Sequence, residues 1–244
     1  LLKSLLKQVD RINTVSRDAT INLKEFGIER DDIVLIENGI DVEYFKTGEM
    51  EDIKSALNIE KHRKLMGFFG RFMPEKGFRV LVEAFNLLFH DSSIDNDTLP
   101  IVVTYGWGGF IREEYEYIEQ LGLSKYFVQQ PATNQMPTKI KSLNVVAIPS
   151  LTEACPLLAM EVLCTKVPVI GTNCNGLREV LEGSPAFVAQ VGSAQSLKEC
   201  IVSFLVDDHL SQFKEYGETA RNRFDVVKSS HKLKMTYEAM MSND

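Results

Sequence analysis

Short runs of apolar, β-branched residues alternate along the chain with longer segments in which apolar positions recur every three to four residues. The short runs are typical of buried strands, and the longer segments have the period of helices packed on one face. The expected strands are residues 11–15, 33–36, 65–69, 101–105, 126–129, 144–148, 167–171 and 186–189. The expected helices are residues 16–26, 78–89, 111–121, 135–142, 157–165, 177–182 and 194–206, followed by two more within 210–241, one through 224 and one through 237.

This alternation predicts βαβ units, and therefore an α/β fold in which helices cover both faces of a parallel sheet. Right-handed crossovers turn such units into a doubly wound, Rossmann-like layer. A turn signal at Asn38-Gly39-Ile40-Asp41 follows an expected strand, and we expect a domain boundary there. The chain opens on Leu1-Leu2-Lys3 in an amphipathic stretch, so we interpret it as a fragment of a longer protein.

Composition and charge narrow the function classes. The 244 residues are 44% hydrophobic and 25% charged, as in ordinary globular proteins, and the net charge of −7 argues against a nucleic-acid partner. The four cysteines show no C-x-x-C spacing, so we expect no metal site and reduced thiols in a cytoplasmic protein. No apolar run is long enough to span a membrane and no signal peptide is recognisable, which leaves open only a peripheral membrane contact.

A basic loop with glycines at both ends is expected between the strand at 65–69 and the helix that starts near residue 78. Its sequence is Gly70-Arg71-Phe72-Met73-Pro74-Glu75-Lys76-Gly77. Gly70 lets the backbone approach a ligand, while the guanidinium of Arg71 and the ammonium of Lys76 suit phosphate oxygens. The loop is therefore a candidate diphosphate site. The alternative is a solvated turn in which Glu75 pairs with a neighbouring cation.

Two glutamates eight positions apart, Glu153 and Glu161, lie where the strand at 144–148 gives way to a helix. Open α/β sheets bind ligands at such turns. A carboxylate on either side of a bound phosphate can accept hydrogen bonds from sugar hydroxyls, with Glu153 nearer the sugar and Glu161 within reach of a ribose. The alternative is a surface acid and a helix-face charge stabilised by the helix dipole.

The start of this helix is a candidate phosphate site. Ser150 or Thr152 can cap the helix, and Pro156 suits its first position because the missing amide needs no partner there. The next free amides, those of Leu157 and Leu158, would then point toward an incoming phosphate.

A third candidate loop, residues 171–180, contains Asn175-Gly176, which can adopt positive φ and either present amides to a ligand or simply close a turn. The chain contains neither a Walker loop nor a G-x-G-x-x-G fingerprint, and no nucleophile triad is recognisable.

In chain order, these segments resemble the carboxyl-terminal half of the retaining GT-B glycosyltransferases of family 4. Residues 70–77 resemble its G-R-x-x-x-x-K-G loop, and residues 149–161 resemble P-S-x-x-E-x7-E. Further matches are residues 36–45 with the interdomain N-G-[IV]-D…F segment, 168–170 with P-V-I, 176–180 with G-x-x-E-V, and 16–17 with the end of the amino-terminal domain. Three positions depart from the family pattern: Ala154-Cys155-Pro156 replaces the frequent Gly-Phe-Gly, Lys166 replaces a glycine, and Asn175 replaces another.

The resemblance implies one half of a GT-B fold, with residues 1–38 as a remnant of the amino-terminal acceptor domain with its linker and residues 39–244 as the carboxyl-terminal nucleotide-sugar-binding domain. It implies a hexosyltransferase-type enzyme that transfers a sugar from a UDP- or GDP-sugar, with retention, to a carbohydrate or lipid-linked acceptor bound through the missing domain. The isolated chain is expected to bind a nucleotide sugar weakly and to transfer nothing.

The same resemblance implies the roles of individual residues. Arg71 and Lys76 would stabilise the departing diphosphate, Glu153 would orient the donor sugar and Glu161 would hold the ribose, with no metal or other cofactor required. Two alternatives stay open, because a fold does not fix a function: a catalytically silent nucleotide-binding or interaction module, and a sugar-nucleotide epimerase or phosphorylase of the same architecture.

Overall fold

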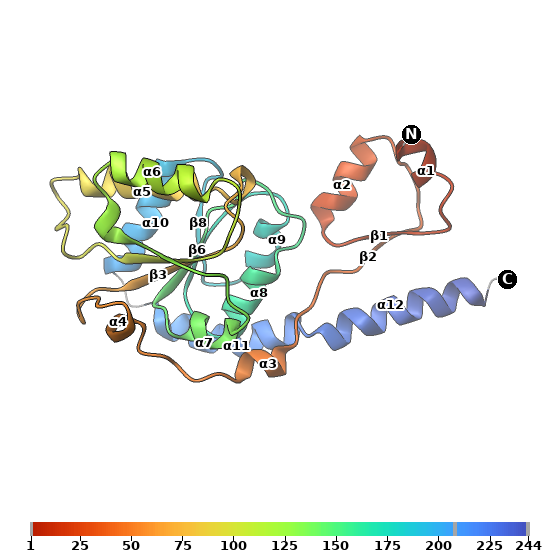
Figure 1. Ribbon diagram of the computed structural model, residues 1–244. Helices are drawn as coiled ribbons and strands as arrows, with labels where there is room; N and C mark the ends of the chain where they lie inside the picture. Colours follow the sequence, from red (N-terminus) through yellow and green to blue (C-terminus); the bar gives the residue numbers. More distant parts are fainter. Residues whose placement is uncertain (1, 207–208, 243–244) are drawn as a thin grey trace.

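The computed structural model describes residues 2–206 and 209–242, which form a small amino-terminal lobe beside a larger α/β body (Figure 1). In the lobe, two short strands pair in parallel, with Ile12 opposite Ile33. The lobe consists of α1 (Leu2–Leu6), β1 (Ile12–Thr14), α2 (Arg17–Glu25) and β2 (Ile33–Leu35). A linker, residues 36–41, leads from it to the larger body.

The larger body contains a six-stranded, wholly parallel sheet in the order β5-β4-β3-β6-β7-β8. Its strands are β3 (Leu65–Phe69), β4 (Ile101–Tyr105), β5 (Phe127–Gln130), β6 (Val145–Ile148), β7 (Val169–Thr172) and β8 (Phe187–Ala189). Every residue of β3, β4, β6 and β7 is buried, which explains why their sequences are mostly apolar. The order confirms the predicted doubly wound, Rossmann-like sheet.

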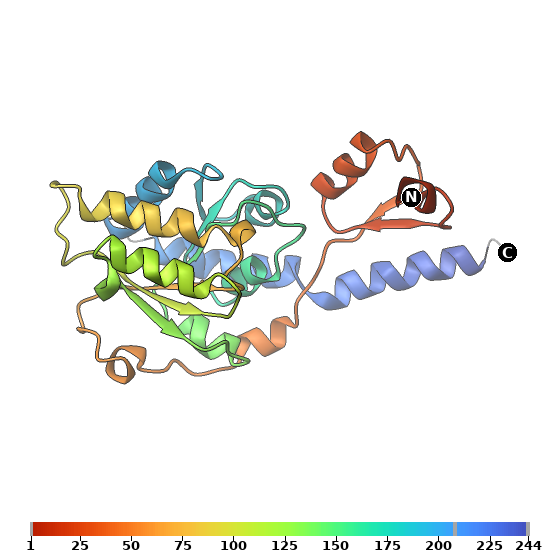
Figure 2. The same cartoon turned by 45° about the horizontal axis from the view of Figure 1, so that its top comes forward.

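Helices cover both faces of this sheet (Figures 1 and 2). One layer contains α5 (Phe78–Phe89), α6 (Ile111–Gln120) and α10 (Ala194–Val206), and the other contains α3 (Val42–Lys46), α7 (Met136–Lys141), α8 (Leu157–Cys164) and α11 (Leu210–Arg223). The short α9 (Leu177–Leu181) packs against β7 and α8 on the side facing the lobe, and α12 (Val226–Met241) runs beneath the lobe (Figure 1).

The elements match the sequence expectations closely, with shifts of one or two residues at most strand ends. Five short elements were not predicted: α1, α3, α4 (Ile53–Ala56) and the 3-10 turns η1 (Pro74–Lys76) and η2 (Ser124–Tyr126). Each is too short to show a helical period. The last helix extends beyond the predicted residue 237 to Met241. Within residues 2–206 and 209–242, no helix combines the length and apolarity needed to span a bilayer.

Candidate functional site

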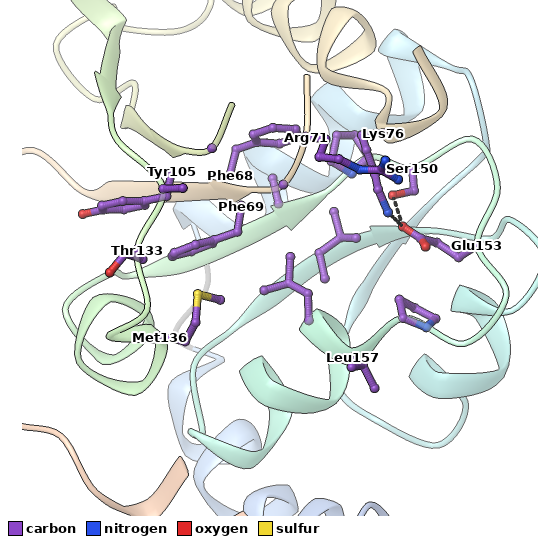
Figure 3. Close-up of a pocket in the computed structure, with 18 of the residues that line it drawn as sticks. Phe68, Phe69, Arg71, Lys76, Tyr105, Thr133, Met136, Ser150, Glu153 and Leu157 are labelled. Carbon is purple, nitrogen blue, oxygen red and sulfur yellow. Dashed lines mark hydrogen bonds and ion pairs between the residues drawn. The ribbon is translucent and has the colours of Figure 1, made fainter. Parts of the chain in front are cut away.

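The site lies where the sheet changes direction. β3 and β6 are neighbours, but the chain leaves β3 toward β4 on one side and leaves β6 toward β7 on the other. Such a switch point opens a crevice outside the carboxyl ends of the two strands. A cavity of about 460 Å³ lies there (Figure 3). Its lining includes Phe68, Phe69, Gly70, Arg71, Lys76, Tyr105, Gly106, Trp107, Ala132, Thr133, Met136, Ala147, Ile148, Pro149, Ser150, Glu153, Cys155, Pro156, Leu157 and Leu158.

The loop after β3 is held by its own apolar residue. Phe72 is buried and packs against Phe68 and Phe78, with ring centroids 5.6 and 4.8 Å away, and its amide donates to the carbonyl of Trp107 at 2.8 Å. The preceding side chain, Arg71, therefore stays exposed at the cavity mouth. Anchoring Phe72 in the core thus leaves the side chain of Arg71 at the cavity.

Gly77 joins the two loops of the site. It has φ 65°, and a Cβ added to it would lie 1.9 Å from the carbonyl oxygen of Pro149. Just beyond, the amide of Leu151 donates to the carbonyl of Glu75 at 2.8 Å. The backbone of residues 75–77 therefore lies directly against the backbone that follows β6, an approach that only glycine permits.

The polar end of the cavity is centred on Glu153. Its Oε1 accepts hydrogen bonds from Nζ of Lys76 at 2.7 Å and from Oγ of Ser150 at 2.8 Å (Figure 3). The side chains of Lys76 and Glu153 are 26% and 13% exposed. The ammonium retains donors for an anion, so a bound phosphate and Glu153 would share it.

Arg71 supplies the second cation. Among the residues that the structure describes, no hydrogen bond or ion pair engages its guanidinium, and Glu75, the partner expected for a solvated turn, forms no ion pair there. Arg71 lines both this cavity and an adjoining hollow next to α2. Its fork of donors is thus available to phosphate oxygens.

The helix after Glu153 begins where the expected range 157–165 placed it, but the role predicted for Pro156 is wrong. Pro156 is the N-cap residue rather than the first helical residue, and α8 begins at Leu157. The predicted capping by Ser150 or Thr152 is wrong, because α8 has no side-chain cap: Ser150 donates to Glu153 instead. Leu157 and Leu158 line the cavity at the start of α8.

Glu161 lies one turn further along α8, outside the residues that line the cavity. It is partly buried, and burial raises the pKa of its carboxyl to about 7. Its spacing places it on the face of α8 that carries Leu157 and Leu158.

The other end of the cavity is aromatic, and sequence reasoning missed it. The rings of Phe69 and Tyr105 are stacked, with centroids 4.9 Å apart and planes 13° apart, and Thr133 and Met136 lie beside them (Figure 3). Burial raises the pKa of the Tyr105 hydroxyl to about 12, so this group stays neutral. A signal was present in the sequence, because these residues end or follow β3, β4 and β5 and therefore belong to the ligand-binding edge.

The third candidate loop supports the site rather than offering amides to a ligand. Gly176 has the predicted positive φ, 71°, but its amide donates to Oδ2 of Asp18 at 2.9 Å. The carbonyl of Asn175 accepts from the amide of Glu153 at 3.2 Å. Within residues 2–206 and 209–242, no cluster of three or more His, Cys, Asp or Glu side chains is placed to hold a metal ion.

Comparisons with known proteins agree with this geometry. An Escherichia coli UDP-Gal:alpha-D-GlcNAc-diphosphoundecaprenol alpha-1,3-galactosyltransferase is 26% identical over 233 residues, which are 93% of this chain and 59% of the relative. A D-inositol 3-phosphate glycosyltransferase of Corynebacterium glutamicum is 27% identical over 91% of this chain and 55% of its own length. The chain thus spans little more than half the length of these curated relatives.

Solved structures share the fold. Anabaena HepE in complex with UDP and glucose superposes with a TM-score of 0.85 at 20% identity, over 97% of this chain and 67% of HepE. Sucrose-phosphate synthase from Thermosynechococcus elongatus superposes with a TM-score of 0.86 at 18% identity, over 100% of this chain and 61% of that protein.

Residues 49–223, which are most of the chain, match the family described as Glycosyl transferases group 1. This match confirms the resemblance drawn from the ordered motifs, and it includes both the 70–77 loop and the Glu153 and Glu161 pair. The chain therefore belongs to the glycosyl transferases group 1 family, whose members are retaining GT-B glycosyltransferases.

Proposed function

We propose that this chain is the donor-binding half of a glycosyltransferase that takes a hexose from a nucleotide diphosphate sugar with retention of configuration. The observation that carries the proposal is the convergence of Arg71, Lys76 and Glu153 on one cavity at the switch point of the sheet. Two cations beside a carboxylate suit a ligand with a negative diphosphate and a hydroxyl-rich sugar.

The nucleotide sugar would lie along the cavity. Its diphosphate would meet Arg71, Lys76 and the amides of Leu157 and Leu158, and its base would occupy the aromatic end. Glu161, one turn along α8, would receive the ribose hydroxyls, and Glu153 would orient the sugar. A UDP-sugar is the donor we favour, because the E. coli relative is named for UDP-galactose and HepE was solved with UDP-glucose.

The chemistry assigned to these residues is stabilisation of the leaving group. As the bond between the sugar and the diphosphate breaks, negative charge grows on the departing oxygen. Fixed cations aimed at that oxygen lower the free energy of the transition state more than that of the bound substrate. Arg71 and Lys76 can fulfil this role without a metal ion.

Acceptor binding belongs, in this proposal, to the part of the relatives that the chain does not span. Residues 1–38 would be the end of that acceptor domain with its linker, and residues 39–244 the nucleotide-sugar-binding domain. The acceptor would be a carbohydrate or a lipid-linked saccharide, and the 244-residue chain alone would bind the donor weakly and transfer nothing. A cytoplasmic location, with or without peripheral membrane contact, fits the four free cysteines.

Titration calorimetry of the 244-residue chain with UDP, GDP and uridine tests the proposal. We expect UDP to bind, and to bind more tightly than either GDP or uridine. Binding of none of the three would contradict the donor site. Release of sugar from UDP-glucose by the chain alone, at a rate above the uncatalysed one, would contradict the proposal that this half binds the donor but cannot react without the acceptor domain.

A further inference from the structure

Two buried carboxylates, Asp18 of the small lobe and Glu179 of α9, each accept hydrogen bonds from the backbone on the other side of the lobe boundary. Glu179 of α9 accepts hydrogen bonds from the backbone amides of Arg17 at 2.8 Å and Asp18 at 2.7 Å, the first two residues of α2. Asp18 in turn accepts from the amide of Gly176, directly before α9, at 2.9 Å. Each helix therefore begins on a carboxylate supplied by the other, so the amides that a helix start leaves unpaired are satisfied across the lobe boundary.

Charge and burial make this contact specific. The side chains of Asp18 and Glu179 are each 7% exposed. Nε of Arg178 lies 3.1 Å from Asp18, and Nε of Arg17 lies 3.1 Å from Glu179. The Arg178 guanidinium holds the pKa of Asp18 below its usual range, so the carboxylate is charged at neutral pH. Removing a partner from such a buried charge is costly, which restricts sliding of the lobe along α9.

The other end of α9 is fixed to the sheet body. Arg223, the last residue of α11, donates to the carbonyl of Glu179 at 2.6 Å and to that of Glu182 at 2.9 Å. Since α11 packs on α8, these bonds hold α9 in the frame of the large body. The lobe is therefore positioned relative to α8, the helix at the site, through its contacts with α9.

The segment held by Asp18 is also the segment on which Glu153 rests. A Cβ added to Gly176 would lie 2.4 Å from the carbonyl oxygen of Ala154 and 2.5 Å from that of Glu153. The amide of Glu153 donates to the carbonyl of Asn175. Contacts thus run without a break from Asp18 through residues 175–176 to the backbone of Glu153.

The lobe also forms a wall beside the polar end of the site. A hollow of about 400 Å³ lies between α2 and the site loops, with Asn22 on the lobe side and Arg71, Lys76 and Glu153 on the other. The aromatic end of the donor cavity does not border this hollow. A shift of the lobe would therefore disturb the surroundings of Glu153 more than the nucleotide end.

We infer that Asp18 and Glu179 are positioning residues, which lock the small lobe onto α9 and thereby hold Glu153 in place for the donor sugar. The inference rests on the proposed function for its consequence in binding, but the mechanical link from Asp18 to Glu153 is independent of any ligand.

Asp18→Asn and Glu179→Gln in the 244-residue chain test the inference by calorimetry with UDP and UDP-glucose. Loss of one charge-assisted bond predicts about tenfold weaker binding of UDP-glucose, with UDP affected by less than about twofold. Asp91→Asn is the control, because it removes a carboxylate from an ion pair, 2.5 Å to Nζ of Lys198, that lies outside both cavities. It is expected to change neither affinity.

A second measurement needs no ligand. Hydrogen exchange of the Glu153 amide is expected to be about tenfold faster in Asp18→Asn than in the parent chain or in Asp91→Asn, since its acceptor on Asn175 loses support. Unchanged exchange at Glu153, or equal loss of affinity for UDP and UDP-glucose, would overturn the positioning role. Faster exchange in a parent chain that binds neither ligand would support the positioning role while overturning the proposed function. If Asp18→Asn does not fold, Arg178→Ala provides the same comparison.

Discussion

At the scale of single residues, the site uses side chains whose neighbours determine what they can do. Lys76 and Ser150 both donate to one carboxylate oxygen of Glu153, which fixes that side chain at the cavity edge. Arg71 is exposed beside them because the next residue, Phe72, is anchored in the core. The phosphate-binding role proposed for the two cations depends on this difference. Lys76 is held in place by Glu153, whereas the exposed side chain of Arg71 can extend toward a phosphate.

Arg71→Ala and Lys76→Ala are each expected to weaken UDP binding about tenfold or more, because in the proposed function each removes a charge-assisted hydrogen bond to the diphosphate. Uridine, which lacks the phosphates, is expected to lose much less. Calorimetry with both ligands measures the difference, and Lys232→Ala, an exposed residue of α12, is the control. Equal losses for UDP and uridine would contradict the phosphate assignment.

Glu161→Gln is expected to change stability in a pH-dependent way. Burial raises the carboxyl pKa from 4.5 to about 7, so the folded chain holds this proton more tightly than the unfolded chain does. The resulting stabilisation is complete below pH 4.5 and is lost as the pH rises through about 7. Glutamine cannot ionise, so the variant should match the parent at pH 4 and exceed it by about 1 to 3 kcal/mol at pH 8.

Urea unfolding at the two pH values measures this effect. Glu119→Gln, an exposed residue of α6, is the control and should show no such pH dependence. The same Glu161→Gln variant should bind UDP more weakly at pH 8 if Glu161 accepts hydrogen bonds from the ribose. A variant less stable than the parent at pH 8 would mean that the carboxylate has a partner that compensates for its burial.

At the scale of elements, the site depends on loops that follow strands and lie directly against each other. The turn η1 is followed by Gly77, whose positive φ allows its backbone to reach the carbonyl of Pro149 after β6. The loop after β7 supports the same segment from the other side through Asn175. Three strand ends are thus joined by backbone contacts, which is why small backbone changes should affect the whole site.

Gly77→Ala tests this packing, and Gly122→Ala is its matched control. Both glycines have similar positive φ, 65° and 70°, but an added Cβ meets Pro149 at 1.9 Å in the first case and nothing within 4 Å in the second. Gly122→Ala should cost only the backbone strain, about 1 kcal/mol, whereas Gly77→Ala should cost about 3 kcal/mol or more and weaken UDP binding. Equal destabilisation in thermal unfolding would show that the loops can separate freely.

At the scale of the whole molecule, two bodies meet at a polar boundary. The main core cluster begins at Ile40, and every fully buried apolar member of it lies in the larger body. The lobe is attached through the linker, where Asn38 donates to the carbonyl of Cys155 at 3.1 Å, and through the Asp18 and Glu179 contacts. The polar boundary therefore sets the position of the lobe, while the core around the sheet supplies most of the stability of the fold.

Deletion of residues 1–36 is expected to leave a body that unfolds in one cooperative transition and binds UDP within about threefold of the parent, a change no larger than that of a surface substitution. The reason is that the deletion leaves the sheet and the donor cavity with all their lining residues. Circular dichroism during heating and calorimetry measure the two properties. Loss of the cooperative transition would show that the lobe belongs to the core.

The sequence by itself determined the sheet, the helices on both faces and the three loops that surround the site. These follow from local period, from buried apolar runs and from the rule that ligands bind at strand ends. It also pointed to Arg71, Lys76 and Glu153, because the type of a residue and its position after a predicted strand can both be read from the sequence. Even the unusual Lys166 at a family glycine position fits, since it has a positive φ of 65°.

Only the tertiary structure decided which distant groups meet. The stacked pair Phe69 and Tyr105, the hydrogen bond of Ser150 to Glu153 in place of a helix cap, and the bond from Asp18 to Gly176 all depend on the packing of separate elements. The side-chain partner of a polar group is chosen by the nearest donor in space, and chain spacing does not encode that distance. The physical reason is that local preferences set each element, while burial and hydrogen-bond satisfaction across elements set their contacts.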